Sequence, residues 1–276
     1  MELARHPVLV EGRCALVGMV HLLPLPGSAR WGRGGRAEIQ AMLDRAARDA
    51  EALLVGGCDA LLVENMHDLP YLRGHVPPET VAAMTLGVAH VAALGAPVGV
   101  QVLAGANREA LGVAIAAGAS FIRAEAFAYA HVADEGWMDA TAGELLRARH
   151  ALEPVGAATQ TAIWADIKKK HSAHAVTADI SLGEFASGSA FCGADAVIVT
   201  GQATGQPARL EDVIEAKVAK LPVVVGSGID ASNAATFAEH AAALIVGTSL
   251  KVDGDWRNPV DRVRVDRLAR ALGRVA

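Results

Sequence analysis

The chain has 276 residues, of which 52% are hydrophobic and 4% aromatic, with a formal net charge of -5. This length suits one α/β barrel domain over residues 1–276, with a core of small aliphatic side chains. The acidic balance gives no electrostatic reason to bind nucleic acid, so we expect no nucleic-acid partner. The most apolar stretch, residues 81–105, is interrupted too often for a transmembrane helix. Three widely spaced cysteines suit a reducing compartment, so we expect a cytoplasmic protein.

Eight short runs rich in Val, Ile, Leu and Ala end in polar or glycine residues and are usually followed by a helix-like segment. The runs are residues 15–20, 59–63, 97–103, 120–124, 162–167, 195–199, 222–225 and 242–246. This alternation indicates βα units and a parallel sheet.

Helix signals lie between these runs. An amphipathic segment covers residues 36–55, and prolines 77 and 78 open the next helix. Asn107 is a candidate cap for a helix ending at Ala117, and Ser181 with Glu184 has capping-box spacing. A last helix is expected over residues 261–272.

Eight such units in about 250 residues predict a single-domain (β/α)8 barrel. The main alternative is a doubly wound open sheet, which would bind a dinucleotide through a G-x-G-x-x-G turn after its first strand. Here the first turn reads His21-Leu22-Leu23-Pro24-Leu25-Pro26-Gly27, so the sequence has no nucleotide-cofactor motif.

The segment Asp166-Ile167-Lys168-Lys169-Lys170-His171 follows the fifth apolar run. With strand alternation, Asp166, Lys168 and Lys170 would point to one side, placing an acid and two bases in one pocket. Lys168 is the first candidate for proton transfer or Schiff-base formation, because crowding by Lys170 would lower its pKa while Asp166 would oppose that change. The alternative is a solvated lysine run between a strand and a loop.

Polar residues follow the other runs as well, and in a barrel all these strand ends open on one face. Arg123 and Glu125 can share one side of a strand as a structural ion pair or as substrate contacts. Glu64, with Asn65 and Asp68, can serve as acid and base or bind a divalent ion, or the three can form an Asn-Asp turn.

Two glycine-rich turns follow the seventh and eighth runs, where barrels often bind phosphate through backbone amides. The alternative is that these glycines only allow tight turns. We favour phosphate binding, because both turns lie in the expected units.

These patterns give a set of candidate site residues. The catalytic candidates are Asp166, Lys168, Glu64 and His21; the substrate-binding candidates are Asn65, Gln101, Arg123, Glu125, Lys170, His171, Thr200 and Gly201; the phosphate-binding candidates are Gly226, Ser227, Gly228, Gly247, Thr248 and Ser249. No cofactor follows from the sequence, although Glu64, Asp166 and His171 are weak candidates for a divalent metal. The segment 127–139, with His131, Asp134 and Glu135, is a candidate lid. We expect a small phosphorylated ligand and a homo-oligomer.

Several blocks together resemble a known family. They are Gly18-Met19-Val20-His21-Leu22-Leu23-Pro24-Leu25-Pro26-Gly27-Ser28, Val63-Glu64-Asn65, Val76 to Thr85, Asp166 to His171, Ile198-Val199-Thr200-Gly201 and Val225-Gly226-Ser227-Gly228. Nearly the whole chain resembles the BtpA/SgcQ family, which implies a TIM-barrel domain of the phosphate-binding type. Met66-His67-Asp68 departs from the family pattern, in which an aromatic and a glycine usually separate the asparagine from the aspartate. The resemblance supplies no catalytic residues, so the roles above rest on residue chemistry.

Three functions are compatible with these observations. The first is an enzyme that holds a phosphorylated sugar or nucleotide-like molecule and performs lyase, isomerase or glycosyl-transfer chemistry. The second is a non-catalytic assembly factor, which the resemblance implies because the family is named after a cyanobacterial protein implicated in photosystem I biogenesis. The third is a metal-dependent hydrolase, which ranks lower because no tight ligand spacing such as H-x-H occurs.

Overall fold

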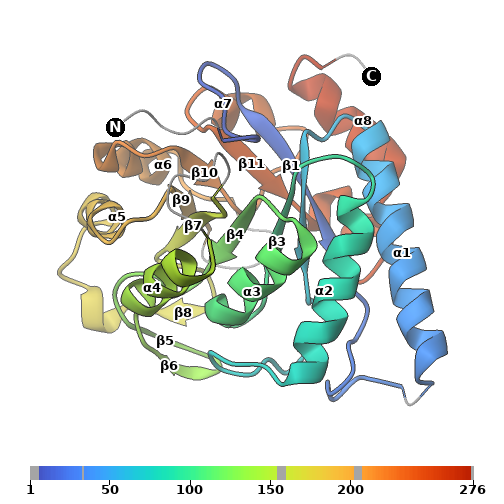
Figure 1. The fold of residues 1–276 in the computed structure, drawn as a ribbon. Helices are drawn as coiled ribbons and strands as arrows, with labels where there is room; N and C mark the ends of the chain where they lie inside the picture. Colours follow the sequence, from blue (N-terminus) through green and yellow to red (C-terminus); the bar gives the residue numbers. More distant parts are fainter. Residues whose placement is uncertain (1–5, 33, 154–159, 202–206, 275–276) are drawn as a thin grey trace.

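Eight parallel strands close into a barrel in the computed structural model, which describes residues 6–32, 34–153, 160–201 and 207–274 (Figure 1). The barrel strands are β1 (Ala15–His21), β2 (Ala60–Glu64), β3 (Val98–Gln101), β4 (Phe121–Ala124), β7 (Ala162–Ile167), β9 (Ala196–Val199), β10 (Val223–Val225) and β11 (Ala243–Val246). Around the barrel they follow the order β1, β11, β10, β9, β7, β4, β3, β2. The predicted single (β/α)8 barrel is therefore confirmed, with each strand within two residues of its predicted run.

Helices cover the outside of the barrel (Figure 1). They are α1 (Arg36–Val55), α2 (Pro78–Ala92), α3 (Asn107–Ala117), α4 (Ala142–Leu152), α5 (Leu182–Phe191), α6 (Leu210–Ala216), α7 (Ala234–Ala238) and α8 (Arg262–Ala271). The predicted capping box is confirmed, because the Ser181 hydroxyl accepts from the Glu184 backbone and the Glu184 carboxylate accepts from the Ser181 backbone. Among the described residues, no helix is both long and apolar enough to cross a membrane.

The predicted cap at Asn107 is wrong, since Asn107 is already the first helical residue and Ala106 precedes it. The Asn107 amide instead donates to the Glu125 carbonyl, with an N···O distance of 2.6 Å, and to the Thr141 hydroxyl. The Asn107 side chain therefore binds the backbone after strand β4 instead of capping helix α3.

Strand alternation divides the barrel core into two regions. Outward side chains pack against the helices, while inward side chains fill the barrel with a separate apolar cluster. In that inner cluster the Phe121 and Trp164 rings stack with centroids 3.9 Å apart, and the His6 ring packs against both of them. In the described part of the chain this apolar cluster fills the barrel interior, and the pocket described below lies at the carboxyl ends of the strands.

Gly99 makes this aromatic floor possible, because a Cβ at that position would lie 2.2 Å from the Phe121 ring. We expect Gly99→Ala to lower the free energy of unfolding by about 1–3 kcal/mol through overpacking. Gly112, inside α3, is the matched control, because an added Cβ there meets only Arg108 Nη1, at 3.9 Å. Gly112→Ala should raise the free energy of unfolding by about 0.5–1 kcal/mol. Denaturant unfolding of both variants measures the difference, and equal effects would contradict the overpacking.

A three-stranded antiparallel sheet stands beside the barrel mouth, below β4 and β7 in Figure 1. It consists of β5 (His131–Ala133), β6 (Gly136–Met138) and β8 (Ser172–Ala173), in the order β6, β5, β8. The candidate lid is therefore a β-hairpin whose turn, Asp134 and Glu135, reaches the pocket described below.

Candidate functional site

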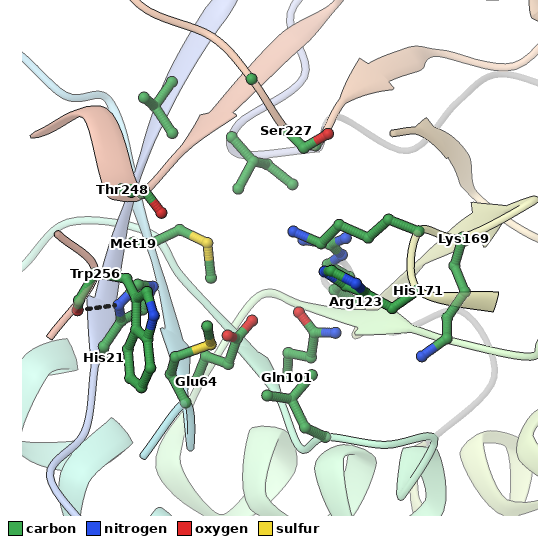
Figure 2. Close-up of a pocket in the computed structure, with 18 of the residues that line it drawn as sticks. Met19, His21, Glu64, Gln101, Arg123, Lys169, His171, Ser227, Thr248 and Trp256 are labelled. Atoms are coloured by element: carbon green, nitrogen blue, oxygen red, sulfur yellow. Dashed lines mark hydrogen bonds between the residues drawn. The ribbon is translucent and has the colours of Figure 1, made fainter. Parts of the chain in front are cut away.

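A cavity of about 490 Å³ opens at the carboxyl ends of the barrel strands (Figure 2). Its lining includes nine of the predicted site residues from the strand ends and the two glycine-rich turns, namely His21, Glu64, Gln101, Arg123, Glu125, Lys170, His171, Ser227 and Thr248. Gly226, Gly228, Gly247 and Ser249 line it as well. The structure thus places side chains from five strand ends and two turns around one cavity.

The barrel register explains why these side chains meet. His21 lies beside Glu64 and Glu64 beside Gln101 in neighbouring strands, so all three occupy the same level. Each is an inward residue at the end of its strand, above the apolar layer. Because side chains alternate along each strand, three residues distant in the sequence lie side by side and form one polar wall of the cavity.

Glu64 is a buried carboxyl group without a partner in the described part of the chain. Glu64 is only 5% exposed, and its carboxyl group forms no hydrogen bond or ion pair with the described residues. Burial raises the pKa of Glu64 to about 7, an increase that Arg123 and Lys170 partly offset. A carboxyl group with this pKa can donate or accept a proton near neutral pH.

His21 is also suited to proton transfer. Its Nδ1 lies 3.1 Å from the Trp256 carbonyl oxygen, and a carbonyl can only accept, so Nδ1 carries the proton. Burial and the charge of Lys251 lower the pKa of His21 well below its usual value, which keeps the ring neutral. A Cβ at Gly247 would lie 3.4 Å from the other nitrogen, Nε2, so this basic nitrogen faces the eighth-strand turn.

Arg123 and Asp166 form a buried two-pronged ion pair. Nε and Nη2 of Arg123 each donate to one oxygen of Asp166 at 3.0 Å. Asp166 is therefore occupied by Arg123 and does not line the cavity, although it was predicted to transfer protons. The sequence left open whether Arg123 forms an ion pair with Glu125 or contacts a substrate; the structure instead pairs it with Asp166, because β7 lies next to β4.

The expected side for Lys168 is wrong. Strand β7 ends at Ile167, and Lys168 has a φ of 45°, a left-handed conformation that breaks the alternation. Its ammonium group donates to the Ile180 carbonyl oxygen at 2.5 Å and lies outside the cavity lining. Lys169 and Lys170 line the cavity instead.

Lys169 belongs to a buried polar network with Glu125 and Gln101. Its ammonium group lies 3.3 Å from one Glu125 oxygen, and the Gln101 amide donates to the other oxygen at 3.1 Å. Burial alone would lower the pKa of Lys169, but Glu125, Glu135 and Asp166 outweigh it and raise the pKa. Lys169 is therefore a fixed cation.

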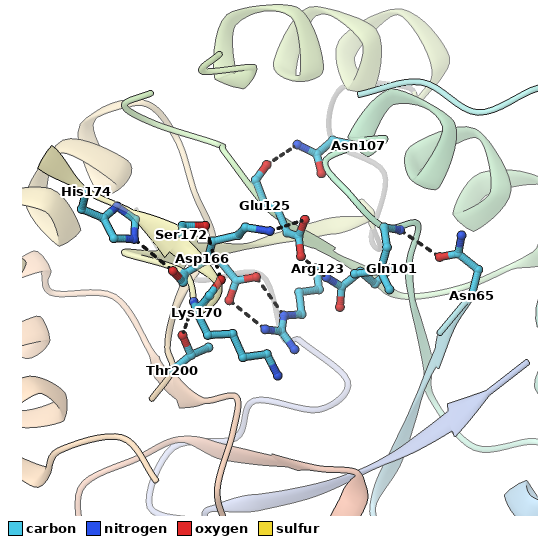
Figure 3. A network of polar contacts seen from close by, with 12 residues as sticks. Asn65, Gln101, Asn107, Arg123, Glu125, Asp166, Lys170, Ser172, His174 and Thr200 are labelled. Atoms are coloured by element: carbon cyan, nitrogen blue, oxygen red, sulfur yellow. Dashed lines mark hydrogen bonds and ion pairs between the residues drawn. The ribbon is translucent and has the colours of Figure 1, made fainter. Parts of the chain in front are cut away.

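Lys170 is held only through its backbone, whose N–H donates to the Thr200 hydroxyl at 3.2 Å (Figure 3). Its ammonium group makes no hydrogen bond or ion pair with residues in the described ranges, and it lines the cavity. Burial and the neighbouring Arg123 lower the pKa of Lys170. Two groups with opposite roles, the Glu64 carboxyl and the Lys170 amine, thus face the same space.

The two glycine-rich turns form the opposite wall. Figure 2 shows Ser227 and Thr248 across the cavity from Glu64 and Gln101. The Ser249 hydroxyl donates to the Ile229 carbonyl at 2.6 Å, which ties the two turns together. Within the described ranges, the backbone N–H groups of Gly228, Thr248 and Ser249 donate to no protein acceptor. Unpaired N–H groups at a cavity wall are suited to hold an anion.

Three predicted substrate contacts have structural roles instead. The Asn65 amide oxygen accepts from the Leu103 backbone at 2.9 Å, and its nitrogen donates to Asp68, as in the alternative Asn-Asp turn. Thr200 holds the Lys170 backbone, and the Gly201 N–H donates to the Ser227 hydroxyl at 2.7 Å. None of Asn65, Thr200 and Gly201 is among the cavity-lining residues.

The weak metal candidates do not form one cluster. Glu64 and His171 line the cavity, but Asp166 is bound by Arg123. Across the described residues, no three His, Cys, Asp or Glu side chains are placed to hold a metal ion. The proposed ligand set of Glu64, Asp166 and His171 is therefore wrong.

Several residues that line the cavity were not predicted from the sequence. They are Lys169 and the side chains Met19, Met66, Leu69, Tyr71, Leu103 and Trp256. Lys169 lies at the cavity because it forms an ion pair with Glu125, and this contact between distant residues depends on the tertiary structure. Trp256 lies in a loop ten residues after the end of β11, so no strand end marks it. The only signal in the sequence is an aromatic residue close to the eighth βα unit.

The sequence matches known proteins over almost its full length. Residues 13–274 match the BtpA family. An uncharacterised mitochondrial protein of Caenorhabditis elegans is 44% identical over 270 residues, covering 94% of this chain and 93% of the relative. The photosystem I biogenesis protein BtpA of Synechocystis is 38% identical over 268 residues, covering 93% and 87%.

Solved structures share the barrel at low identity. Phosphoribosyl anthranilate isomerase from Thermus thermophilus superposes with a TM-score of 0.55 and 14% identity, covering 94% of this chain and 98% of that chain. At this identity the similarity establishes only the fold, a (β/α)8 barrel. The match over residues 13–274 and the two relatives establish the family as well: this chain belongs to the BtpA family.

Proposed function

We propose that this protein is an enzyme acting on a small phosphorylated molecule, a sugar phosphate or a nucleotide-like compound. The observation that carries the proposal is the single cavity in which two glycine-rich turns face Glu64 and Lys170. One wall offers anion-binding groups and the other offers groups able to transfer a proton. This division suits a substrate that is held at one end and reacts at the other.

The phosphate would lie against the turns after β10 and β11. Backbone N–H groups of Gly228, Thr248 and Ser249 are available there, and a hydroxyl comes from Thr248. Phosphate sites in barrels of this kind commonly follow the seventh and eighth strands, which are β10 and β11 in this chain. The isomerase from Thermus thermophilus, named for a phosphoribosyl substrate, has the same fold.

The reacting end would lie beside Glu64, His21 and Lys170. Glu64 has a pKa of about 7, and His21 is held neutral with its Nε2 unprotonated. These two groups would exchange protons with the substrate, while the charged Arg123 and Lys169 would stabilise negative charge. Such chemistry includes lyase, isomerase and glycosyl-transfer reactions.

Charge reversal at the phosphate wall tests the proposal. Thr248→Asp places a carboxylate against the bound phosphate, so we expect inorganic phosphate and ribose 5-phosphate to bind about tenfold or more weakly. Isothermal titration calorimetry and thermal shift measure the binding to wild type and variant. Ribose without phosphate should give no comparable shift in either protein.

Thr236→Asp is the matched control, because Thr236 is exposed on α7 and does not line the cavity. This variant should bind phosphate as the wild type does. Absence of any phosphate effect on the wild-type protein would reject the phosphate site.

A second candidate function is assembly of a protein complex, favoured by the 38% identity to the photosystem I biogenesis protein of Synechocystis. In that role the chain would bind a protein partner without needing the cavity. Partner recovery that is unchanged in Thr248→Asp, with no phosphate binding by the wild type, would favour assembly over catalysis. Formation of a homo-oligomer and a cytoplasmic location remain predictions from the sequence.

A further inference from the structure

Three consecutive lysines after β7 have three different environments. The Lys168 ammonium group donates to the Ile180 carbonyl, and Lys169 is paired with Glu125. Lys169 and Lys170 both line the cavity, but the Lys170 ammonium group forms no hydrogen bond or ion pair with the described residues. The Asp166 carboxylate is already held by both prongs of Arg123, and Glu64 acts on Lys170 through its charge without forming an ion pair.

The position of Lys170 is defined although its ammonium group is not bonded. Its backbone N–H donates to the Thr200 hydroxyl on the neighbouring strand end, which fixes where the side chain starts. Figure 3 shows the side chain extending into the space beside Arg123. Glu64, also without a side-chain partner in the described ranges, borders the same cavity.

We propose that Lys170 is a nucleophile that forms an imine with the carbonyl carbon of an aldehyde or ketone substrate. The neutral Nζ attacks the carbonyl carbon and gives a carbinolamine after proton transfer to its oxygen. Protonated Glu64 then donates a proton to the carbinolamine hydroxyl, which leaves as water, and an iminium ion remains. One C–N double bond replaces the C–O double bond, and no oxidant or reductant is required.

This inference deepens the proposed function and rests on it for the phosphate of the substrate. It narrows the substrate class to phosphorylated carbonyl compounds, such as open-chain sugar phosphates. An iminium ion withdraws electrons from the adjacent carbon, so it suits carbon–carbon bond cleavage or isomerisation next to the carbonyl.

The charged groups around Lys170 come from three strands and oppose one another. Burial and Arg123, on β4, favour the neutral amine, whereas Glu64 on β2, Asp166 on β7 and Glu125 after β4 favour the ammonium ion. The net result is a lowered pKa for Lys170, in the direction a nucleophilic amine requires. Lys169, one residue away, has a raised pKa and is the internal comparison.

Reductive trapping tests the inference directly. The full-length protein is incubated with D-glyceraldehyde and sodium cyanoborohydride, which reduces an imine to a stable secondary amine. The chain has only six lysines, Lys168, Lys169, Lys170, Lys217, Lys220 and Lys251, so mapping is simple. Cleavage before aspartates releases residues 166–178, and fragmentation of this peptide distinguishes its three lysines.

We expect the adduct to form on Lys170 at pH 7 roughly tenfold faster than on the exposed Lys217 and Lys220, because the Lys170 amine is buried at the cavity, unpaired among the described residues, and has a lowered pKa. Lys170→Arg should abolish this fast labelling, and Lys168→Arg should retain it, since Lys168 lies outside the cavity. The wild-type pH dependence supplies a test that needs no variant: Lys170 labelling should level off below the pH at which the exposed lysines do.

Labelling of Lys170 that is no faster than labelling of Lys217 and Lys220, and that still rises through pH 10, would overturn the inference. Glyceraldehyde carries no phosphate, so its trapping reports on Lys170 independently of the phosphate wall. Fast labelling of Lys170 with no response to inorganic phosphate would retain the imine and reject the proposed phosphate site. Phosphate binding without preferential labelling of Lys170 would retain the phosphate site and reject the imine.

Discussion

Replacing Arg123 by methionine should lower the free energy of unfolding by about 3–5 kcal/mol, because it leaves the Asp166 carboxylate buried without its counter-ion. Asp166 is 3% exposed, and both of its oxygens accept from Arg123 at 3.0 Å. Denaturant unfolding at pH 7 measures the loss.

The double variant Arg123→Met/Asp166→Leu is the control for this loss. A buried ion pair replaced by apolar side chains of similar volume is often neutral in stability, so the double variant should recover most of the lost free energy. A single variant that loses less than about 1 kcal/mol would mean that the pair is solvated and that the floor of the cavity is wet.

Glu64→Gln should stabilise the protein at alkaline pH and have little effect at acidic pH. The pKa of Glu64 is about 7 in the folded protein against 4.5 for an unperturbed glutamate, so the folded state holds this proton more tightly than the unfolded state. The contribution of Glu64 to stability is therefore greatest below pH 4.5 and falls as the pH rises to about 7. Above pH 7 the penalty amounts to about 2–4 kcal/mol, which glutamine avoids.

The measurement compares the unfolding free energies of variant and wild type at pH 5 and pH 8. Glu51→Gln, an exposed position on α1, should show the same small difference at both pH values. If the effect of Glu64→Gln were also independent of pH, Glu64 would be ionised throughout this range and unsuited to proton transfer.

The burial of Arg123 and the burial of Glu64 have the same structural cause. Arg123 and Glu64 occupy inward positions at strand ends, where period-2 alternation places the last side chain above an apolar floor. Arg123 has a carboxylate, Asp166, within hydrogen-bond distance, whereas Glu64 forms no ion pair with a cation in the described part of the chain. The same barrel position therefore gives a structural ion pair in one strand and a titratable group in another.

The local sequence determined the barrel. Short β-branched runs and amphipathic segments are local patterns, and eight repeats of them leave few arrangements other than a closed parallel sheet. The same alternation predicted which end of the strands carries the site, and the cavity contains His21, Glu64, Gln101 and Arg123 as expected.

Only the tertiary structure decided which charges are paired and which are available. The sequence favoured Asp166 and Lys168, but Asp166 is neutralised by a residue 43 positions earlier in the chain. Lys168 leaves the cavity because one left-handed backbone angle turns the chain after β7. Partner choice and backbone rotation past a strand end depend on neighbours distant in sequence, whereas alternation within a strand depends on the strand itself. For that reason the sequence predicted which strand ends surround the cavity, and the structure showed that the Glu64 and Lys170 side chains have no hydrogen-bond or ion-pair partner among the described residues.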